Sequence, residues 1–271
     1  MHLSRRPERD RLTAPGPEGG LETASLRHQW RLLAPPGGLE ELLQTRIRPL
    51  LVDLSARPDV GAVYFARYQQ EALLFVNCDA ELDLPGKRVP FVPELARYGG
   101  EEGFRIAEGI FEADSLPSLD LLEARLAGKG RPLRESSVLL TERLLDLLAF
   151  DRNRRIAFYR ASYAWALDQG RWDEGDLRLL DARYRGLREG LAELLHSSDH
   201  EECATWTRRT RPWVERLRAA HGAGGIDQDL GSLAWSYAHM QCNRLGIDGD
   251  AEAILRYFMQ RVHEDGLGIL A

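Results

Sequence analysis

The chain has 271 residues, 44% of them hydrophobic, which is enough to bury a sizeable core without disulfide staples. A formal net charge of −6 argues against a general binder of nucleic-acid phosphates, and the three cysteines are widely spaced with no CxxC pair. This cysteine usage favours a reducing, cytoplasmic location. Residues 1–24 are rich in Arg, Pro, Gly and Glu, which predicts a disordered tail with neither a signal peptide nor a membrane span.

Residues 25–100 carry the pattern of a small sheet. β-Branched and aromatic residues are frequent in its apolar runs, and breakers such as Pro35-Pro36-Gly37-Gly38 separate them. One intervening segment instead repeats apolar residues at steps of three and four, with Pro49 as the expected site of a kink. We expect strands at 26–33, 60–68, 71–78 and 89–92 and an amphipathic helix at 39–56.

From residue 101 onward the pattern changes to consecutive helices. They are expected at 101–113, 116–127, 133–148, 152–168, 173–195, 201–220, 230–245 and 250–264. The sequence therefore predicts an α+β fold in which a small N-terminal sheet with one crossover helix packs on a larger C-terminal helical array. Because no linker-like stretch interrupts the chain, we expect one domain over 25–271, with the sheet region at 25–100 and the helical region at 101–271.

One group of residues has the spacing of metal ligands. His196, His200 and Cys203 lie at i, i+4 and i+7, which can place three ligands on one helix face. Ser197-Ser198-Asp199, however, has the pattern of an N-cap that starts a new helix, so the three side chains would not share a face. We therefore expect no metal site.

Two short runs are rich in arginine, at 152–155 and 208–211. In a chain that is acidic overall, runs of this length are more typical of solvated helix faces than of nucleic-acid grooves. We expect no nucleic-acid partner.

A polar stripe crosses the last part of the chain. In residues 237–246 (YAHMQCNRLG), His239, Asn243 and Gly246 follow at steps of four and three, so an imidazole, an amide and a C-cap glycine share one stripe of a helix. Two interpretations are open. The histidine is either buried and satisfied by Asn243, or part of a site where it transfers protons at neutral pH.

Three segments together resemble a known family. RYGG at 97–100, a helix ending in FEADS at 111–115 and HMQCNRLG at 239–246 follow the order found in the C-terminal domain of lantibiotic dehydratases, which also occurs as stand-alone proteins in thiopeptide pathways. The resemblance covers about 29–264. It implies a cofactor-free enzyme whose partners are a precursor peptide, with a leader and a dehydrated, azole-containing core, and other enzymes of the pathway.

In the full-length dehydratases this domain resembles a lyase that expels glutamate from glutamylated Ser or Thr, with arginines and a histidine as key groups. Carried onto this sequence, the histidine is His239 and one arginine is Arg97. Arg143 is the preferred second arginine, with Arg134 and Arg152 as alternatives. The chemistry is coherent, because removal of the α-proton builds enolate charge that an arginine stabilises while a histidine moves protons.

The chain departs from the dehydratase pattern between YFARY at 64–68 and RYGG. The family usually continues with a Pro-His-Leu-Arg strand and a further helix, whereas here only residues 69–93 intervene before the RYGG segment. This reduction resembles the thiopeptide pyridine synthases, which join two dehydroalanines in a formal [4+2] cycloaddition and then expel water and the leader. We rank pyridine synthase first and glutamate-eliminating lyase second. A non-catalytic leader-binding partner protein ranks third, since it needs no polar stripe.

For the cyclase, we expect His239 and the phenol of Tyr237 to assist amide tautomerisation and water loss, although a two-residue step separates them around a helix. Asn243, Glu94 and Tyr98 are the candidates for contacts with the substrate.

Activity should survive chelation, because the expected catalytic groups are side-chain acids and bases rather than a metal. Treatment with EDTA or phenanthroline should leave turnover of the peptide substrate unchanged. Loss of turnover that added zinc restores would contradict this prediction.

Overall fold

The computed structural model describes residues 27–68, 70–78, 82–197 and 201–268. The tail expected at 1–24 lies outside these residues. The sheet part comprises β1 (Arg27–Leu33), α1 (Leu39–Leu42), the π-helical η1 (Leu43–Ile47), α2 (Arg48–Ser55), β2 (Val60–Tyr68), β3 (Glu71–Cys78), β4 (Lys87–Pro90) and the 3₁₀ turn η2 (Leu95–Tyr98). The helical part comprises α3 (Glu101–Leu126), α4 (Leu133–Leu147), α5 (Arg152–Asp168), α6 (Glu174–His196), α7 (Glu201–Gly222), α8 (Leu230–Arg244) and α9 (Gly249–Glu264).

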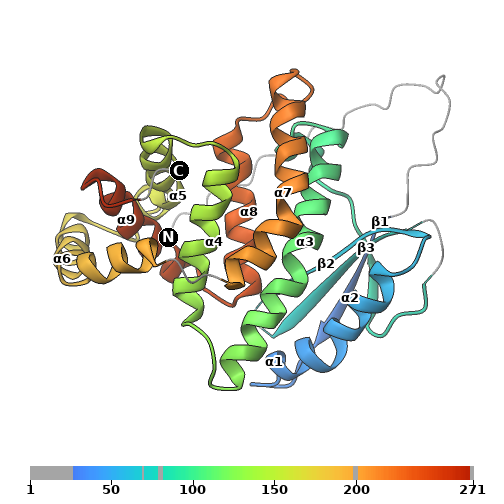
Figure 1. The fold of residues 1–271 in the computed structure, drawn as a ribbon. Coiled ribbons are helices and arrows are strands. Elements are labelled where there is room, and N and C mark those ends of the chain that lie inside the picture. The colour runs from blue at the N-terminus through green and yellow to red at the C-terminus, as the bar shows by residue number, and fades with distance from the viewer. Residues whose placement is uncertain (1–26, 69, 79–81, 198–200, 269–271) are drawn as a thin grey trace, which may run out of the picture.

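The strands form one antiparallel sheet in the order β2-β3-β1-β4. Because β3 pairs with both β1 and β2, the chain must cross over between β1 and β2, and α1, η1 and α2 make that crossover. The expected α+β fold with one crossover helix is confirmed (Figure 1). The crossover helix is interrupted near Pro49, which has no N–H for an i→i−4 hydrogen bond and follows the widened π turn.

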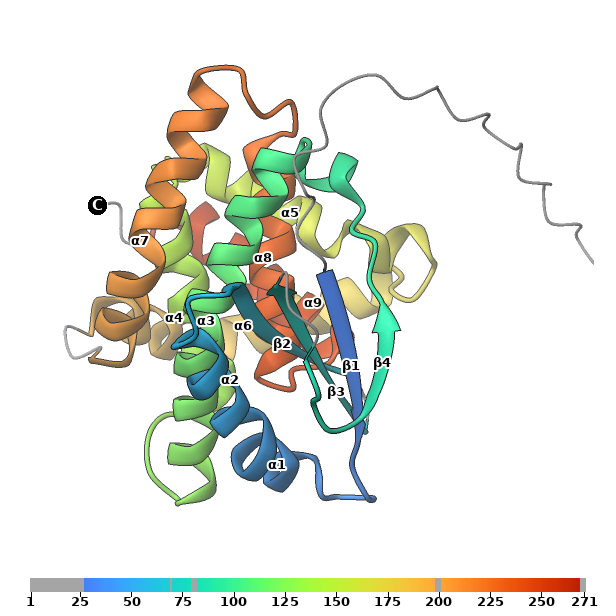
Figure 2. The ribbon, with the colours of Figure 1, turned by 90° about the vertical axis from the view of Figure 1, so that its right-hand side faces the viewer.

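Both faces of the sheet are covered, as the alternation in β2 requires. Val63 and Phe65 point into a core with α1 and α2, while Tyr64 and Ala66 point into the larger core formed with the helical part. Figure 2 shows α1 and α2 on one side of the strands and α3 and α8 on the other. The sheet is therefore a central layer, not an outer one.

The helix α3 is continuous, so the expected break between 113 and 116 is wrong. Asp114 and Ser115 look like helix-breaking residues in the sequence, but both are buried. Ser115 Oγ donates to the carbonyl of Phe111 at 2.7 Å, and Asp114 accepts from another helix. A tertiary partner thus satisfies Asp114, and the carbonyl one turn earlier in the same helix satisfies Ser115, so neither side chain ends the helix. Pro117 is tolerated inside the helix.

The helices form two groups beyond the sheet. α3, α4, α7 and α8 lie next to it, and α5, α6 and α9 lie on the far side (Figure 1). α3 and α7 approach closely because Gly109 has no side chain: a Cβ there would lie 2.3 Å from the ring of Trp213.

A buried ion pair joins the sheet to the helices. Arg244 Nη1 of α8 donates to Asp114 Oδ2 of α3 at 2.7 Å, and its Nε donates to the carbonyl of Phe65 in β2 at 2.8 Å. Trp206 of α7 donates from Nε1 to Asp114 Oδ1 at 2.6 Å. Both charges are buried, so their hydrogen bonds offset the cost of removing them from water.

A second buried network changes the interpretation of one arginine run. Arg155 is 2% exposed and pairs with Glu142 and Asp146, both at 2.5 Å. The expectation that 152–155 is wholly a solvated face is therefore wrong at Arg155. In the run 208–211, all three arginines are exposed as expected, while Thr210 is buried.

Replacing Asp114 by Ala should lower the free energy of unfolding by about 3–5 kcal/mol, because it leaves the guanidinium of Arg244 buried without its counter-charge. Urea unfolding monitored by circular dichroism measures the change. Glu215→Ala is the matched control, since it removes an exposed i,i+4 pair with Arg211 and should cost less than about 0.5 kcal/mol. Equal losses in the two variants would contradict the role assigned to the buried pair.

Candidate functional site

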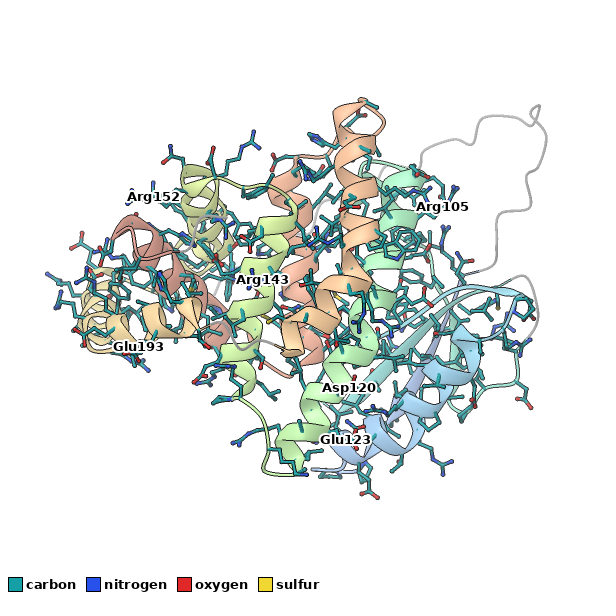
Figure 3. The ribbon with its side chains drawn as sticks, viewed as in Figure 1. Arg105, Asp120, Glu123, Arg143, Arg152 and Glu193 are labelled. Atoms are coloured by element: carbon teal, nitrogen blue, oxygen red, sulfur yellow. The ribbon has the colours of Figure 1, made fainter. Side chains whose placement is uncertain are left out.

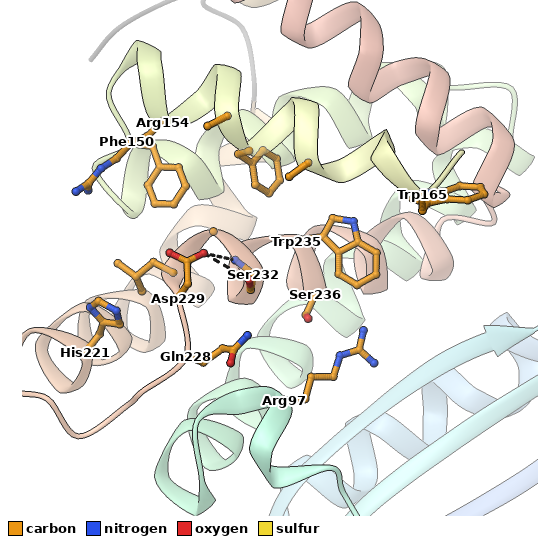
Figure 4. Close-up of a pocket in the computed structure, with 15 residues that line it drawn as sticks. Arg97, Phe150, Arg154, Trp165, His221, Gln228, Asp229, Ser232, Trp235 and Ser236 are labelled. Atoms are coloured by element: carbon orange, nitrogen blue, oxygen red, sulfur yellow. Dashed lines mark hydrogen bonds between the residues drawn. The ribbon is translucent and has the colours of Figure 1, made fainter. Parts of the chain in front are cut away.

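A pocket of about 710 Å³ opens between η2, α5 and the start of α8. Its size is that of a site for a small ligand or a folded peptide segment. Apolar and aromatic side chains make up much of the wall, with a few polar groups among them (Figure 4). The lining residues are Arg97, Phe150, Arg154, Ala157, Phe158, Ala161, Trp165, His221, Gln228, Asp229, Leu230, Gly231, Ser232, Trp235 and Ser236.

Arg97 is placed at this pocket by the RYGG segment. The 3₁₀ turn η2 ends at Gly99, whose φ of 73° suits glycine and lets the chain reverse into α3. Gly103 allows the turn to pack against α3, because a Cβ there would lie 1.8 Å from the carbonyl oxygen of Tyr98. The guanidinium of Arg97 then lies 5.6 Å from the centre of the Trp235 ring.

Trp235 links Arg97 to His239. The indole stacks on the imidazole of His239, one turn further along α8, with ring centres 5.1 Å apart and planes 5° apart. The side chain of His239 is 38% exposed. Two of the predicted site residues, Arg97 and His239, thus contact the same tryptophan; Arg97 and Trp235 line the pocket, and His239 lies behind Trp235 without lining it.

His239 is bonded to an acid that the sequence analysis did not select. Its Nδ1 lies 2.8 Å from Oε2 of Glu252 in α9, and Oε1 of Glu252 accepts from Arg256 at 3.2 Å. Burial by itself would raise the pKa of the Glu252 carboxyl, but the hydrogen bond with His239 and the charge of Arg256 hold that pKa below its usual value. Glu252 is therefore an ionised carboxylate behind the histidine.

Asn243 does not satisfy His239, so the interpretation of a buried His239–Asn243 pair is wrong. Asn243 Oδ1 accepts instead from the backbone N–H of Arg67 in β2 at 2.9 Å. This bond fixes α8 to the edge of the sheet. The use of Asn243 in binding substrate stays a prediction.

Tyr237 faces away from the pocket. It is 3% exposed, packs against Phe111, and its hydroxyl has no hydrogen-bond partner among the described residues. Burial raises the pKa of its phenol far above the usual value. Its surroundings include a void of only about 10 Å³ beside Asp114 and Arg244, too small for substrate. The expected cooperation of Tyr237 with His239 has no support in this geometry, because a two-residue step turns them to different faces.

The other two predicted contact residues lie next to Arg97 but not in the pocket wall. Glu94 is exposed, and its carbonyl accepts from Arg97 N at 2.9 Å, which shapes the turn. Tyr98 packs edge-on against Phe104 and Phe111, and burial raises the pKa of its phenol. Their use in binding substrate stays a prediction.

None of the candidates for the second arginine lines the pocket. Arg143 is 46% exposed on α4 (Figure 3) and pairs with Asp146. Arg152 donates to the carbonyls of His263 and Glu264 and so supports the end of α9. Arg134 lies in a separate hollow of about 870 Å³ formed by α4, α6 and α9.

Sequence reasoning missed three side chains of this site: Trp235, Glu252 and Arg154. Trp235 carried a usable signal, because it precedes His239 by four residues on a predicted helix. Arg154 belongs to a run that we assigned to solvent, and it does lie on the exposed rim of the pocket. Glu252 gave no local signal, since its partner comes from a different helix.

Among the described residues, no three His, Cys, Asp or Glu side chains are placed to hold a metal ion. The candidate group His196, His200 and Cys203 is only partly described, because His200 lies outside those residues. His196 is bonded to the carbonyl of Ala192 at 2.7 Å, and Cys203 is buried.

None of the helices described in the structure is both long and apolar enough to span a bilayer.

The fold resembles three solved structures. The tRNA-dependent lantibiotic dehydratase MibB from Microbispora sp. 107891 matches with a TM-score of 0.63 and 19% identity over 93% of this chain, which spans 29% of that protein's chain. The pyridine synthase TbtD from thiomuracin biosynthesis matches with a TM-score of 0.62 and 15% identity over 89% of this chain and 98% of its own. TsrL matches with a TM-score of 0.59 and 16% identity over 89% of this chain and 95% of its own.

At these identities the structural likeness shows the fold, and no curated protein sequence matches the chain. A comparison with protein-family models assigns the chain to a family. The model described as lantibiotic biosynthesis dehydratase C-term matches residues 87–263, which include the RYGG, FEADS and HMQCNRLG segments. The chain therefore belongs to the lantibiotic biosynthesis dehydratase C-terminal family.

Proposed function

We propose that the protein is a peptide-tailoring enzyme of thiopeptide biosynthesis, and specifically a pyridine synthase. It would join two dehydroalanines of a precursor peptide in a formal [4+2] cycloaddition and then release water and the leader. The observation that carries the proposal is the contact of Arg97 and His239 with one tryptophan, Trp235, at the edge of the pocket.

The pocket supports the first requirement of a cycloaddition, which is orientation. Diene and dienophile lie in one peptide and react when a folded substrate holds them together, so the enzyme gains rate by restricting that peptide. Trp165 and Trp235 give the pocket broad, rigid apolar walls from two different helices (Figure 4). Flat aromatic walls of this kind would pack well against the planar dehydroalanines and azoles of a dehydrated peptide.

His239 supports the second requirement, which is proton transfer. Amide tautomerisation and loss of water each move a proton, and an imidazole can accept and return it at neutral pH. Arg97 lines the pocket, where its guanidinium would stabilise negative charge on a carbonyl oxygen of a bound peptide. Ser236, which also lines the pocket, offers a hydroxyl in the place where we had expected a phenol.

The arrangement of arginines favours the cyclase over the glutamate-eliminating lyase. A lyase must recognise the carboxylate of the glutamyl ester, for which clustered or bidentate arginines are the usual solution. In this pocket Arg97 and Arg154 lie at opposite ends (Figure 4). The lyase remains the second candidate, because Arg97 with His239 is also a sufficient pair for enolate formation.

The names of similar structures agree with a role in peptide tailoring: one is a pyridine synthase and another a lantibiotic dehydratase. A non-catalytic leader-binding protein, the third candidate, would need neither a pocket of this size nor a histidine backed by a carboxylate.

The deciding assay presents the purified protein with a linear, azole-bearing peptide that already contains two dehydroalanines. Mass spectrometry should show the leader as a separate fragment and a smaller pyridine macrocycle, with no glutamate involved. Heat-denatured protein is the control. If this peptide is returned unchanged while a glutamylated serine peptide loses glutamate, the protein is the lyase; if neither peptide reacts but the leader binds, the third candidate holds.

Replacing His239 by Ala should reduce turnover by about 100-fold or more, the range that general acid–base catalysis contributes. Stability should change little, because the side chain is partly exposed. Steady-state kinetics and thermal unfolding measure the two effects separately. A folded variant that retains turnover within about threefold of wild type would assign the histidine a structural role only.

A further inference from the structure

Glu252, in the first turn of α9, is buried and divides its two oxygens between different partners. Oε1 accepts from Arg256 Nη2 at 3.2 Å, and Oε2 lies 2.8 Å from Nδ1 of His239. Arg256 and Glu252 are four residues apart on one helix, so they can compensate each other's charge without a third group. Glu252 therefore does not need His239 to balance its charge, and the hydrogen bond between them calls for another explanation.

Arg256 is fixed on three sides. Its Nη1 donates to Thr141 Oγ1 of α4 at 2.8 Å, and its Nη2 contacts Cys242 Sγ of α8 at 3.5 Å as well as Glu252. The side chain is 3% exposed. Because the guanidinium cannot move, it holds Oε1 of the carboxylate and leaves Oε2 turned to the histidine.

The plane of the imidazole is fixed separately. Trp235 stacks on it with planes 5° apart, which holds the ring plane. A 180° flip within that plane would replace Nδ1 by a carbon at Glu252, so the contact with the carboxylate fixes the orientation of the ring. With the ring plane set by Trp235 and Nδ1 bound to Glu252, the remaining ring nitrogen, Nε2, is the one not engaged by this carboxylate.

We infer that Glu252, held by Arg256, is a positioning residue that keeps the proton of neutral His239 on Nδ1 and leaves Nε2 as the proton acceptor. The reason is chemical: an ionised carboxylate has no proton to give, so the nitrogen that faces it must donate. The catalytic consequence rests on the proposed function of His239. The assignment of the tautomer does not, since it follows from the contacts alone.

A purely structural role explains the arrangement less well. A buried ion pair adds little net stability, and a hydrogen bond that extends it to a partly exposed imidazole adds no buried apolar surface. A carboxylate behind one nitrogen of a histidine is, by contrast, the arrangement that orients a general base in unrelated enzymes.

The test is Glu252→Gln, studied by nitrogen NMR of histidine-labelled protein, with the His239 signals assigned by their loss in His239→Asn. Arg256 should keep the amide oxygen of the glutamine, so the amide NH₂ faces Nδ1. We expect wild type to show the Nδ1–H form of neutral His239 and the variant to show the Nε2–H form. We also expect kcat to fall by about 100-fold, with KM within about threefold of wild type.

Glu264→Gln is the matched control. Glu264 lies on the same helix and accepts from Gln260 and Arg261, but it has no contact with His239 in the structure, so both tautomer and kcat should stay as in wild type. An Nε2–H form in wild type overturns the inference even if the variant does not fold. An unchanged tautomer in Glu252→Gln also overturns it, and so does an inverted tautomer with wild-type kcat. The NMR readout needs no substrate, so it separates failure of this inference from failure of the proposed reaction.

Discussion

The ion pair between Arg244 and Asp114 is the constraint on which the rest of the structure depends. It lies where β2, α3, α7 and α8 meet, and each of these elements supplies a group to it. Two charges taken out of water are tolerated only when both are present and hydrogen-bonded, so the four elements have one compatible arrangement. Arg244 ends α8, and fixing that end also fixes the direction in which Trp235 and His239 point.

The same helix carries the site, but on another side. Arg244 faces the sheet and Asp114, whereas Trp235, His239 and Asn243 follow at four-residue steps along a second face. Along that face Trp235 contributes to the pocket, His239 contacts Glu252 of α9, and Asn243 reaches Arg67 of β2 near the end of the helix. Of the residues that line the pocket, Arg97 of η2 precedes residue 101, and the others belong to the helical part of the chain and its connecting loops. The segment between β2 and η2 can therefore vary without changing the part of the pocket wall that the helical part contributes.

The fold and part of the site could be predicted because their signals are local. A continuous apolar run in β2 specifies two covered faces, because successive side chains of a strand point to opposite sides. Apolar residues that recur about every 3.6 residues specify most of the helices. The ordered RYGG, FEADS and HMQCNRLG segments were sufficient to recognise the family and to select Arg97 and His239. The structure brings both side chains to Trp235.

The sequence by itself determined most of the strands and helices and which of their faces are apolar, and it selected Arg97 and His239 as candidates for one site. Only the tertiary structure decided which distant group satisfies each buried polar side chain. The helix break expected between 113 and 116 does not occur, and Asp114 pairs there with Arg244. Arg155, expected in a solvated run, pairs with Glu142, and the partner of His239 is Glu252 and not Asn243. The physical reason is that the periodicity of apolar residues shows only which side of one helix or strand is buried. The hydrogen-bond partner of a buried polar side chain comes from the element that packs against that side, and no local sequence pattern specifies which element this is.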